Sequence, residues 1–169
     1  MSYKDYIKEV KDFPIEGVNF KDISPLLADE DTFRSSLVDM GKQVRLPNYW
    51  MGIDSRGYLF ASGLATYFGG GVVCARKEGK TPGDFVKKTY DLEYGSATIE
   101  IQPWSGPIGM NEVVIVDDVL ATGGTLKAVN ELAETAGYNV VGNLVLVIGK
   151  TEGHIDQSLF ARNILDEKN

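Results

Sequence analysis

The stretch VVIVDDVLATGGTLKAV, residues 113–129, decides the fold class of this chain. Its four opening β-branched residues predict a buried strand that ends in the adjacent carboxylates Asp117 and Asp118. Two apolar residues later the sequence becomes small and hydroxyl-rich, and a helix is predicted over residues 124–136. A strand, a glycine-rich turn and a helix in this order are typical of a parallel α/β sheet. The residues of the turn are Ala121, Thr122, Gly123, Gly124 and Thr125.

The turn between the predicted strand and helix suits a phosphate group. The first N–H groups of a helix are unpaired and lie at the positive end of its dipole, and glycines let a backbone approach a ligand closely. Thr122 and Thr125 add hydroxyl donors. Ligands collect at the carboxyl ends of parallel strands, where Asp117 and Asp118 would accept hydrogen bonds from vicinal hydroxyls. Phosphate beside hydroxyls describes a ribose 5-phosphate.

Each part of this segment has a simpler reading when taken alone. A bare Gly-Gly pair is more often a tight turn, and an acidic pair is more often a helix cap or a solvated turn. The ordered combination of strand, acidic pair, ATGGT and helix makes the signal strong. Two other phosphate motifs are absent, because Lys127 lies inside the predicted helix and the triple glycine at 69–71 is followed by Val-Val-Cys.

Strand and helix signals alternate along the rest of the chain, which predicts an α/β fold around a mostly parallel central sheet flanked by helices. We expect a single domain over residues 1–169, in which residues 77–97 form a long polar excursion. A helix near residue 31 could be capped by Asp31 or Thr32 and run to about Val44. The other expected helices are residues 2–10 and 57–68, and the other expected strands are 49–54, 71–75, 97–101 and 139–148.

Composition excludes several classes of protein. A net charge of -7 argues against a nucleic-acid partner, and the longest apolar runs, such as residues 140–148, are too short to span a bilayer. Cys74 is the only cysteine, so no internal disulfide forms, and with the single His154 it makes no zinc cluster. The apolar run VVCA predicts that Cys74 is a core residue. A soluble cytoplasmic protein fits these observations.

Residues 113–129 resemble the motif with which type I phosphoribosyltransferases bind 5-phosphoribosyl-1-pyrophosphate (PRPP). Four more blocks narrow the resemblance to the adenine phosphoribosyltransferase family, in order and at about that family's spacing, over residues 12 to 147. The resemblance implies a type I fold with a small base-binding hood at 12–27 and a mobile catalytic loop at 77–97. The blocks are DFPIEGVNFKDISPLL, GIDSRGYLFA, ARKEGKTPG and YDLEYG.

The resemblance also implies where the pyrophosphate of PRPP binds. Ser55 and Arg56 resemble the family's pyrophosphate loop, although a lone arginine is often only a surface salt-bridge partner. Arg76, Lys77 and Lys80 form a basic cluster that would neutralise the leaving group, where a bland reading is a solvated loop. In the family, part of this cluster reaches into a neighbouring subunit's site, which implies a homodimer.

The remaining implied roles concern the base and the metal. Glu93 resembles the catalytic glutamate that manages the proton on N7 of the purine, although an exposed loop carboxylate fits its spacing as well. Asn19, Phe20 and Lys21 resemble the hood over adenine, with Phe20 stacking on the ring, and Tyr94 joins the base-binding residues. Mg²⁺ would arrive with PRPP and contact Asp117 or Asp118 only through water.

The activity implied is transfer of the phosphoribosyl group of PRPP to adenine, giving AMP and pyrophosphate. Two rivals are a sister enzyme for hypoxanthine, guanine, xanthine or orotate, and a regulator that has kept a PRPP site. The chain departs from common family members at Glu112, where many have a basic residue, and in PWSGPIGMNE. The tail after Lys150 resembles nothing informative.

Overall fold

The computed structural model describes residues 3–92, 95–120, 123–148 and 161–166, with backbone alone for 147–148 and 161–166. Its centre is a seven-stranded sheet in the order β5-β6-β4-β3-β7-β8-β9. The pairs β3/β4, β3/β7, β7/β8 and β8/β9 are parallel, and β4/β6 and β5/β6 are antiparallel, so the prediction of a mostly parallel sheet is confirmed. The strands are β3 (Tyr49–Ile53), β4 (Gly71–Lys77), β5 (Val86–Leu92), β6 (Gly95–Ile101), β7 (Glu112–Leu120), β8 (Asn139–Ile148) and β9 (Ala161–Asp166).

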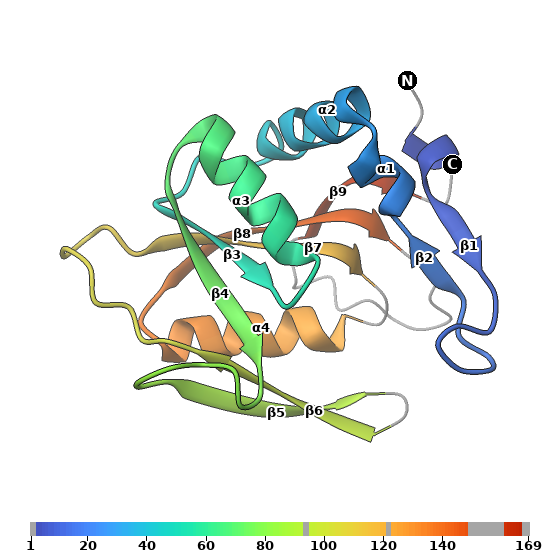
Figure 1. The fold of residues 1–169 in the computed structure, drawn as a ribbon. Coiled ribbons are helices and arrows are strands. Elements are labelled where there is room, and N and C mark those ends of the chain that lie inside the picture. The colour runs from blue at the N-terminus through green and yellow to red at the C-terminus, as the bar shows by residue number, and fades with distance from the viewer. Residues whose placement is uncertain (1–2, 93–94, 121–122, 149–160, 167–169) are drawn as a thin grey trace.

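Helices cover both faces of this sheet (Figure 1). α3 (Gly57–Phe68) lies on one face with α1 (Ser24–Ala28) and α2 (Glu30–Gly41), and α4 (Gly124–Thr135) lies on the other. Because successive side chains of a strand point to opposite faces, β3 and β7 feed two separate cores. Met51 and Ile115 pack on the α4 side, whereas Trp50 and Val114 pack on the α3 side.

The N-terminal helix predicted over residues 2–10 is wrong. The structure has a 3₁₀ turn, η1 (Tyr3–Tyr6), followed by β1 (Lys8–Val10), which pairs antiparallel with β2 (Phe20–Asp22). Pairing with a later segment overrides the weak local helix signal. This two-stranded sheet stands beside the main sheet, at the right of Figure 1.

The boundaries of α2 also differ from the prediction. Asp29, not Asp31 or Thr32, is the N-cap, since its carboxylate accepts a hydrogen bond from the backbone N–H of Thr32 at 2.9 Å. Hydrogen bonding with Thr32, first through its side chain and then through its backbone N–H, lowers the pKa of Asp29. The helix ends at Gly41 rather than near Val44.

Most of the excursion predicted for residues 77–97 is a β-hairpin. β4 continues to Lys77, and β5 and β6 pair from Val86↔Ile101 to Leu92↔Gly95. β5 alternates half-buried Val86, Lys88 and Tyr90 with exposed neighbours. The polar composition of the segment concealed this alternation of period two.

Two further expectations need correction. β7 runs past the acidic pair to Leu120, because β8 pairs with it as far as Ile148. Cys74 is only partly buried, since β4 leaves this part of its length half covered. The tail after Lys150, for which no element was predicted, contains β9, parallel to β8. No helix in the described parts of the chain is long and apolar enough to cross a membrane.

Candidate active site

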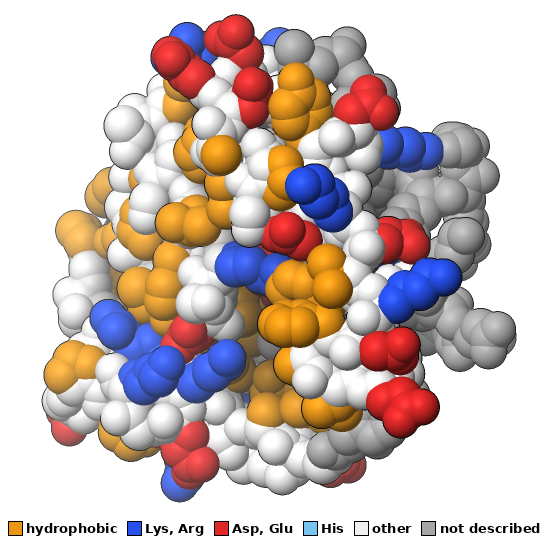
Figure 2. Space-filling view, turned by 45° about the vertical axis from the view of Figure 1, so that its right-hand side comes forward, with side chains coloured by type: hydrophobic (Ala, Val, Ile, Leu, Met, Phe, Trp, Pro, Cys, Tyr) orange, Lys and Arg blue, Asp and Glu red, His pale blue; other side chains and the backbone are white. Residues whose placement is uncertain are grey.

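A cavity of about 620 Å³ opens where β3, β4 and β7 end and α4 begins. Carboxyl ends of parallel strands meet at one edge of a sheet, which explains why segments far apart in sequence supply its walls. Of the predicted site residues, the cavity wall contains Ser55, Arg56, Lys77, Asp117, Asp118 and Thr125. Figure 2 shows basic and acidic side chains close together on one face of the molecule.

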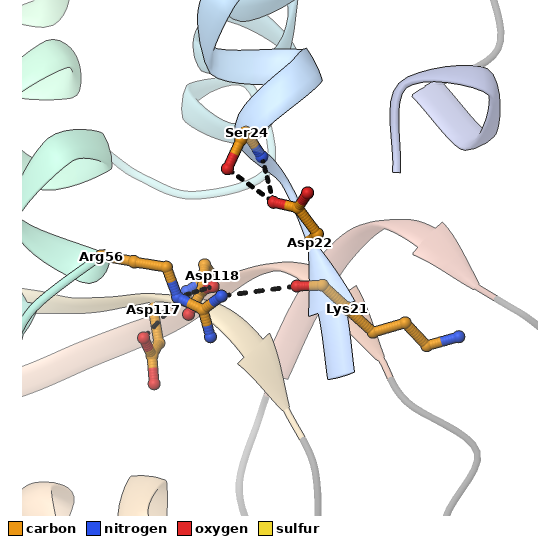
Figure 3. A network of polar contacts seen from close by, with 6 residues as sticks. All are labelled: Lys21, Asp22, Ser24, Arg56, Asp117 and Asp118. Atoms are coloured by element: carbon orange, nitrogen blue, oxygen red, sulfur yellow. Dashed lines mark hydrogen bonds and ion pairs between the residues drawn. The ribbon is translucent and has the colours of Figure 1, made fainter. Parts of the chain in front are cut away.

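Arg56 connects the acidic pair to the hood (Figure 3). Its Nε lies 2.7 Å from Oδ2 of Asp118. Its Nη1 donates to the backbone carbonyl of Lys21 at 3.4 Å, and its guanidinium lies over the Phe20 ring, 4.7 Å from the centroid. Arg56 is therefore a salt-bridge partner, but of a buried carboxylate on the cavity wall rather than of a surface group.

The two carboxylates of the acidic pair differ in their surroundings. Burial raises the pKa of Asp117 well above its ordinary value, and the neighbouring charge of Asp118 raises it further. One Asp117 oxygen accepts the backbone N–H of Asp118 at 2.9 Å. Asp117 thus holds a proton more readily than an ordinary aspartate.

Asp118 offers an unsatisfied acceptor. Its Oδ2 is buried and, among the described residues, accepts no hydrogen bond, since the contact with Arg56 is an ion pair without hydrogen-bond alignment. A buried polar atom without a hydrogen bond calls for a ligand or water to complete it. A hydroxyl group in the cavity would supply the missing donor.

The basic segment at the end of β4, residues 77–81, is bound by two carboxylates, Asp54 and Glu100. Neither was predicted from the sequence as a site residue. Asp54 accepts the backbone N–H of Lys77 at 3.2 Å and lies 3.6 Å from the ammonium of Lys80. Glu100 is only 2% exposed and accepts the backbone N–H groups of Gly79 at 2.9 Å and Thr81 at 3.2 Å. The Gly79 bond is the main reason why the pKa of Glu100 is lowered.

The N-terminus of α4 has the form expected of an anion site. Gly123 precedes the helix with φ 87°, a left-handed conformation that favours glycine. Thr125 lies in the first turn and donates its hydroxyl to the hydroxyl of Tyr90 on β5 at 3.2 Å. Tyr90 also lines the cavity, and the sequence interpretation gave it no role although it opens the block YDLEYG.

The segment predicted to form the hood, residues 12–27, contains β2, which pairs with β1, and most of α1. Asn19 donates to Glu9 at 3.2 Å, and Lys21 pairs with the same carboxylate, so both side chains are directed at β1. Phe20 packs edge-on against Phe13 at 5.1 Å. The Asp22 carboxylate accepts the hydroxyl and N–H of Ser24, which lowers the pKa of Asp22 and ties β2 to α1 (Figure 3).

Not every predicted residue meets the others at this cavity. Arg76 lines a separate cavity of about 550 Å³, whereas Lys77 lines the cavity described above. The two side chains separate because neighbouring residues of a strand point to opposite faces of the sheet. Lys80 does not line the cavity, but its ammonium lies 3.6 Å from Asp54, which does. Four predicted residues lie outside the described residues: Glu93, Tyr94, Ala121 and Thr122.

The cavity fits a metal that arrives with its substrate. No group of three or more metal-ligating side chains occurs within the described residues. Mg²⁺ usually keeps several waters and is bound through one or two carboxylates together with substrate phosphates. Half-buried Asp117 and buried Asp118, both on the cavity wall, match that donor set.

Comparisons with known proteins agree with this fold and site. Residues 47–162 match the phosphoribosyl transferase domain. The adenine phosphoribosyltransferase of Rhodospirillum rubrum is 49% identical over 149 residues, covering 87% of this chain and 86% of that protein. The crystal structure of adenine phosphoribosyltransferase from Rhodothermus marinus has a TM-score of 0.81 at 34% identity, over 95% and 94% of the two chains. The Giardia lamblia enzyme complexed with 9-deazaadenine has a TM-score of 0.76 at 41% identity, over 88% and 86%. The chain therefore belongs to the phosphoribosyltransferase family and, within it, to the adenine phosphoribosyltransferases.

Proposed function

We propose that this protein transfers the 5-phosphoribosyl group of PRPP to N9 of adenine, giving AMP and pyrophosphate in purine salvage. The observation that carries the proposal is the Oδ2 atom of Asp118, which is buried and ion-paired with Arg56 at 2.7 Å but accepts no hydrogen bond among the described residues. It lies on the same cavity wall as the first turn of α4. A hydroxyl acceptor beside a phosphate turn suits a ribose 5-phosphate. The relatives described above are named adenine phosphoribosyltransferases.

The proposed PRPP site uses three parts of the cavity. The turn of residues 121–125 holds the 5′-phosphate, and Asp117 and Asp118 accept the ribose hydroxyls. Ser55, Arg56 and Lys77 face the pyrophosphate, with Lys80 adding positive charge from beside the cavity. Arginine and lysine stabilise the charge that develops on a departing pyrophosphate.

The reaction forms a bond between N9 of adenine and C1 of the ribose while the bond from C1 to the pyrophosphate oxygen breaks. Glu93 is assigned to the N7 proton of the purine, and Tyr94 to the base site. Asn19, Phe20 and Lys21 form the hood, where the backbone at Asn19 and Lys21 reads the adenine edge. The ring of Phe20 would stack on the base. The guanidinium of Arg56 lies over this ring, 4.7 Å from its centroid. Stacking of adenine on Phe20 would therefore involve Arg56 as well.

Mg²⁺ is proposed to be bound with PRPP, with Asp117 or Asp118 holding its waters. When bound, it withdraws charge from the pyrophosphate and improves it as a leaving group. The protein's own contribution is to hold both carboxylates on the cavity wall, with buried Asp118 at 2.7 Å from Arg56.

A homodimer is proposed from Arg76. This residue lies away from its own chain's cavity, where it is available to a second copy. α3 and β4 also carry exposed apolar side chains that a second copy would cover, namely Leu59, Tyr67 and Val72. A cytoplasmic location is proposed because the chain has one cysteine and therefore no internal disulfide framework.

The test is a base panel. We expect kcat/KM for adenine to exceed that for hypoxanthine, guanine and xanthine by ~10⁴-fold or more at the same PRPP and Mg²⁺ concentrations. Backbone acceptors in the hood would pair with the adenine amine but oppose the carbonyl of a 6-oxopurine. Comparable values for adenine and any 6-oxopurine would reject adenine specificity, and inactivity with all bases would reject the transfer itself.

A further inference from the structure

The hairpin β5–β6 touches the phosphate turn through one side chain. Tyr90 lies on β5, half-buried against the core under α4, and its hydroxyl reaches Thr125 Oγ1 at 3.2 Å. Both residues line the 620 Å³ cavity. Thr125 stands at the N-terminus of α4 and Tyr90 comes from an edge of the sheet. Two elements far apart in sequence thus place hydroxyl groups at one point of the wall.

The position of Tyr90 is fixed on both sides. Two residues before it, Lys88 forms an ion pair with Glu131 of α4 at 2.8 Å. Across the hairpin, Tyr90 is registered with Ala97, and the preceding pair, Thr89 and Thr98, shares a hydrogen bond of 2.8 Å. The hairpin is therefore held against α4, and the Tyr90 hydroxyl is presented at a defined place.

The chemistry of two hydroxyls in contact sets what this pair can bind. Each hydroxyl carries one proton, so one of them donates to the other and a single O–H remains. In the structure Thr125 donates to Tyr90, which leaves the phenolic proton for a further acceptor. A phosphate oxygen in the turn would be such an acceptor, and hydrogen bonds to charged oxygens are the stronger ones.

We propose that Tyr90 is a further substrate-binding residue, which donates its phenolic hydroxyl to the 5′-phosphate of PRPP and AMP. The inference rests on the proposed function, which places that phosphate at the N-terminus of α4, beside Thr125. It extends the phosphate site from a single turn to the neighbouring hairpin. Occupancy of the phosphate site then strengthens the contact between β5 and α4.

The experiment compares ligands with and without the 5′-phosphate on the full chain. Tyr90→Phe removes the hydroxyl and keeps the ring in the core. Titration calorimetry should show AMP binding weakened about 10- to 100-fold, the range for losing a hydrogen bond to a charged group, with adenosine unchanged. Tyr138→Phe is the matched control, a tyrosine of the same core cluster that lies outside the cavity, and it should leave both affinities unchanged.

Thr125→Val separates this inference from the function on which it rests. If Thr125→Val weakens AMP selectively and Tyr90→Phe does not, Tyr90 is no ligand of the phosphate and the proposal is overturned. An equal loss of AMP and adenosine in Tyr90→Phe would also overturn it, by showing a structural role. If neither variant changes the ratio of AMP to adenosine affinity, the phosphate assignment itself fails. Support requires a selective loss in both variants and a smaller combined loss in the double variant than the sum.

Discussion

Removing the Arg56 side chain should destabilise the fold as well as the site. Arg56→Ala leaves the Asp118 carboxylate, only 6% exposed, without its cation at 2.7 Å. It also removes the guanidinium from the Phe20 ring, 4.7 Å away. The reverse change, Asp118→Asn, leaves an arginine that is 35% exposed and can turn toward water.

The size of the effect follows from these exposures. Breaking a fully buried ion pair by removing one partner costs about 3–5 kcal/mol, whereas a fully exposed pair contributes about 0.2–1 kcal/mol. The Arg56–Asp118 pair lies between these limits, and the cation–π contact adds about 0.5–1 kcal/mol. We therefore expect Arg56→Ala to lower the free energy of unfolding by about 2–3 kcal/mol, and Asp118→Asn by less than about 1 kcal/mol.

Urea denaturation followed by circular dichroism measures these values, and Arg34→Ala provides the control. Arg34 pairs with Glu30 at 2.7 Å, the same distance, but both side chains are more than half exposed. Its loss should cost about 0.5 kcal/mol or less, whereas Arg56→Ala should lower Tm by about 5–10 °C. Equal costs for Arg56→Ala and Arg34→Ala would refute the argument, because burial of the acidic partner would then make no difference.

Three other predictions concern catalysis, assembly and acid stability. Glu93→Gln should slow single-turnover chemistry by ~10²–10⁴-fold with little change in the Kd of PRPP; parent-like rates would leave Glu93 without a chemical role. Mixed Arg76→Ala and Asp117→Asn/Asp118→Asn chains should regain activity that neither homodimer has, and a fully active monomer by sedimentation would contradict this. The folded-state pKa of Glu100 is lowered, so its stabilisation is complete at neutral pH and is lost as pH falls from about 4.3, the unfolded value, through the lower folded pKa. Glu100→Gln should therefore flatten the acid side of the stability profile, and an unchanged profile would exclude this contribution.

The sequence predicted the elements whose signals are local. The strand at residues 49–54, the helix at 57–68 and the strand–turn–helix at 113–136 have clear apolar patterns, and the structure places elements at all of them. The N-terminal helix was wrong because β1 is formed by pairing with β2, ten or more residues away. β5 was not predicted because a charged residue, Lys88, occupies one of its inward positions and breaks the apolar pattern. In the structure this charge forms an ion pair with Glu131 of α4.

The site was predictable where strand ends converge. Asp117 and Asp118 lie near the carboxyl end of β7, Lys77 ends β4 and Arg56 follows β3. The parallel sheet brings these three strand ends to one cavity. Residues whose role depends on contacts with a different segment of the chain could not be predicted. Nothing local in the sequence indicates that Glu100, on a strand beside the turn, accepts two backbone N–H groups from it.

β5 is one of the two edge strands of the seven-stranded sheet, and this position bears on how the protein behaves at high concentration. An edge strand offers its unpaired backbone groups to any extended segment that it meets, which is a common route to aggregation. The exposed positions of β5 include Lys87 and Asp91. A second copy pairing along this edge would have to remove these charges from water. The strand that presents Tyr90 to the cavity thus keeps its outer edge hydrated, which favours solubility over fibre-like association.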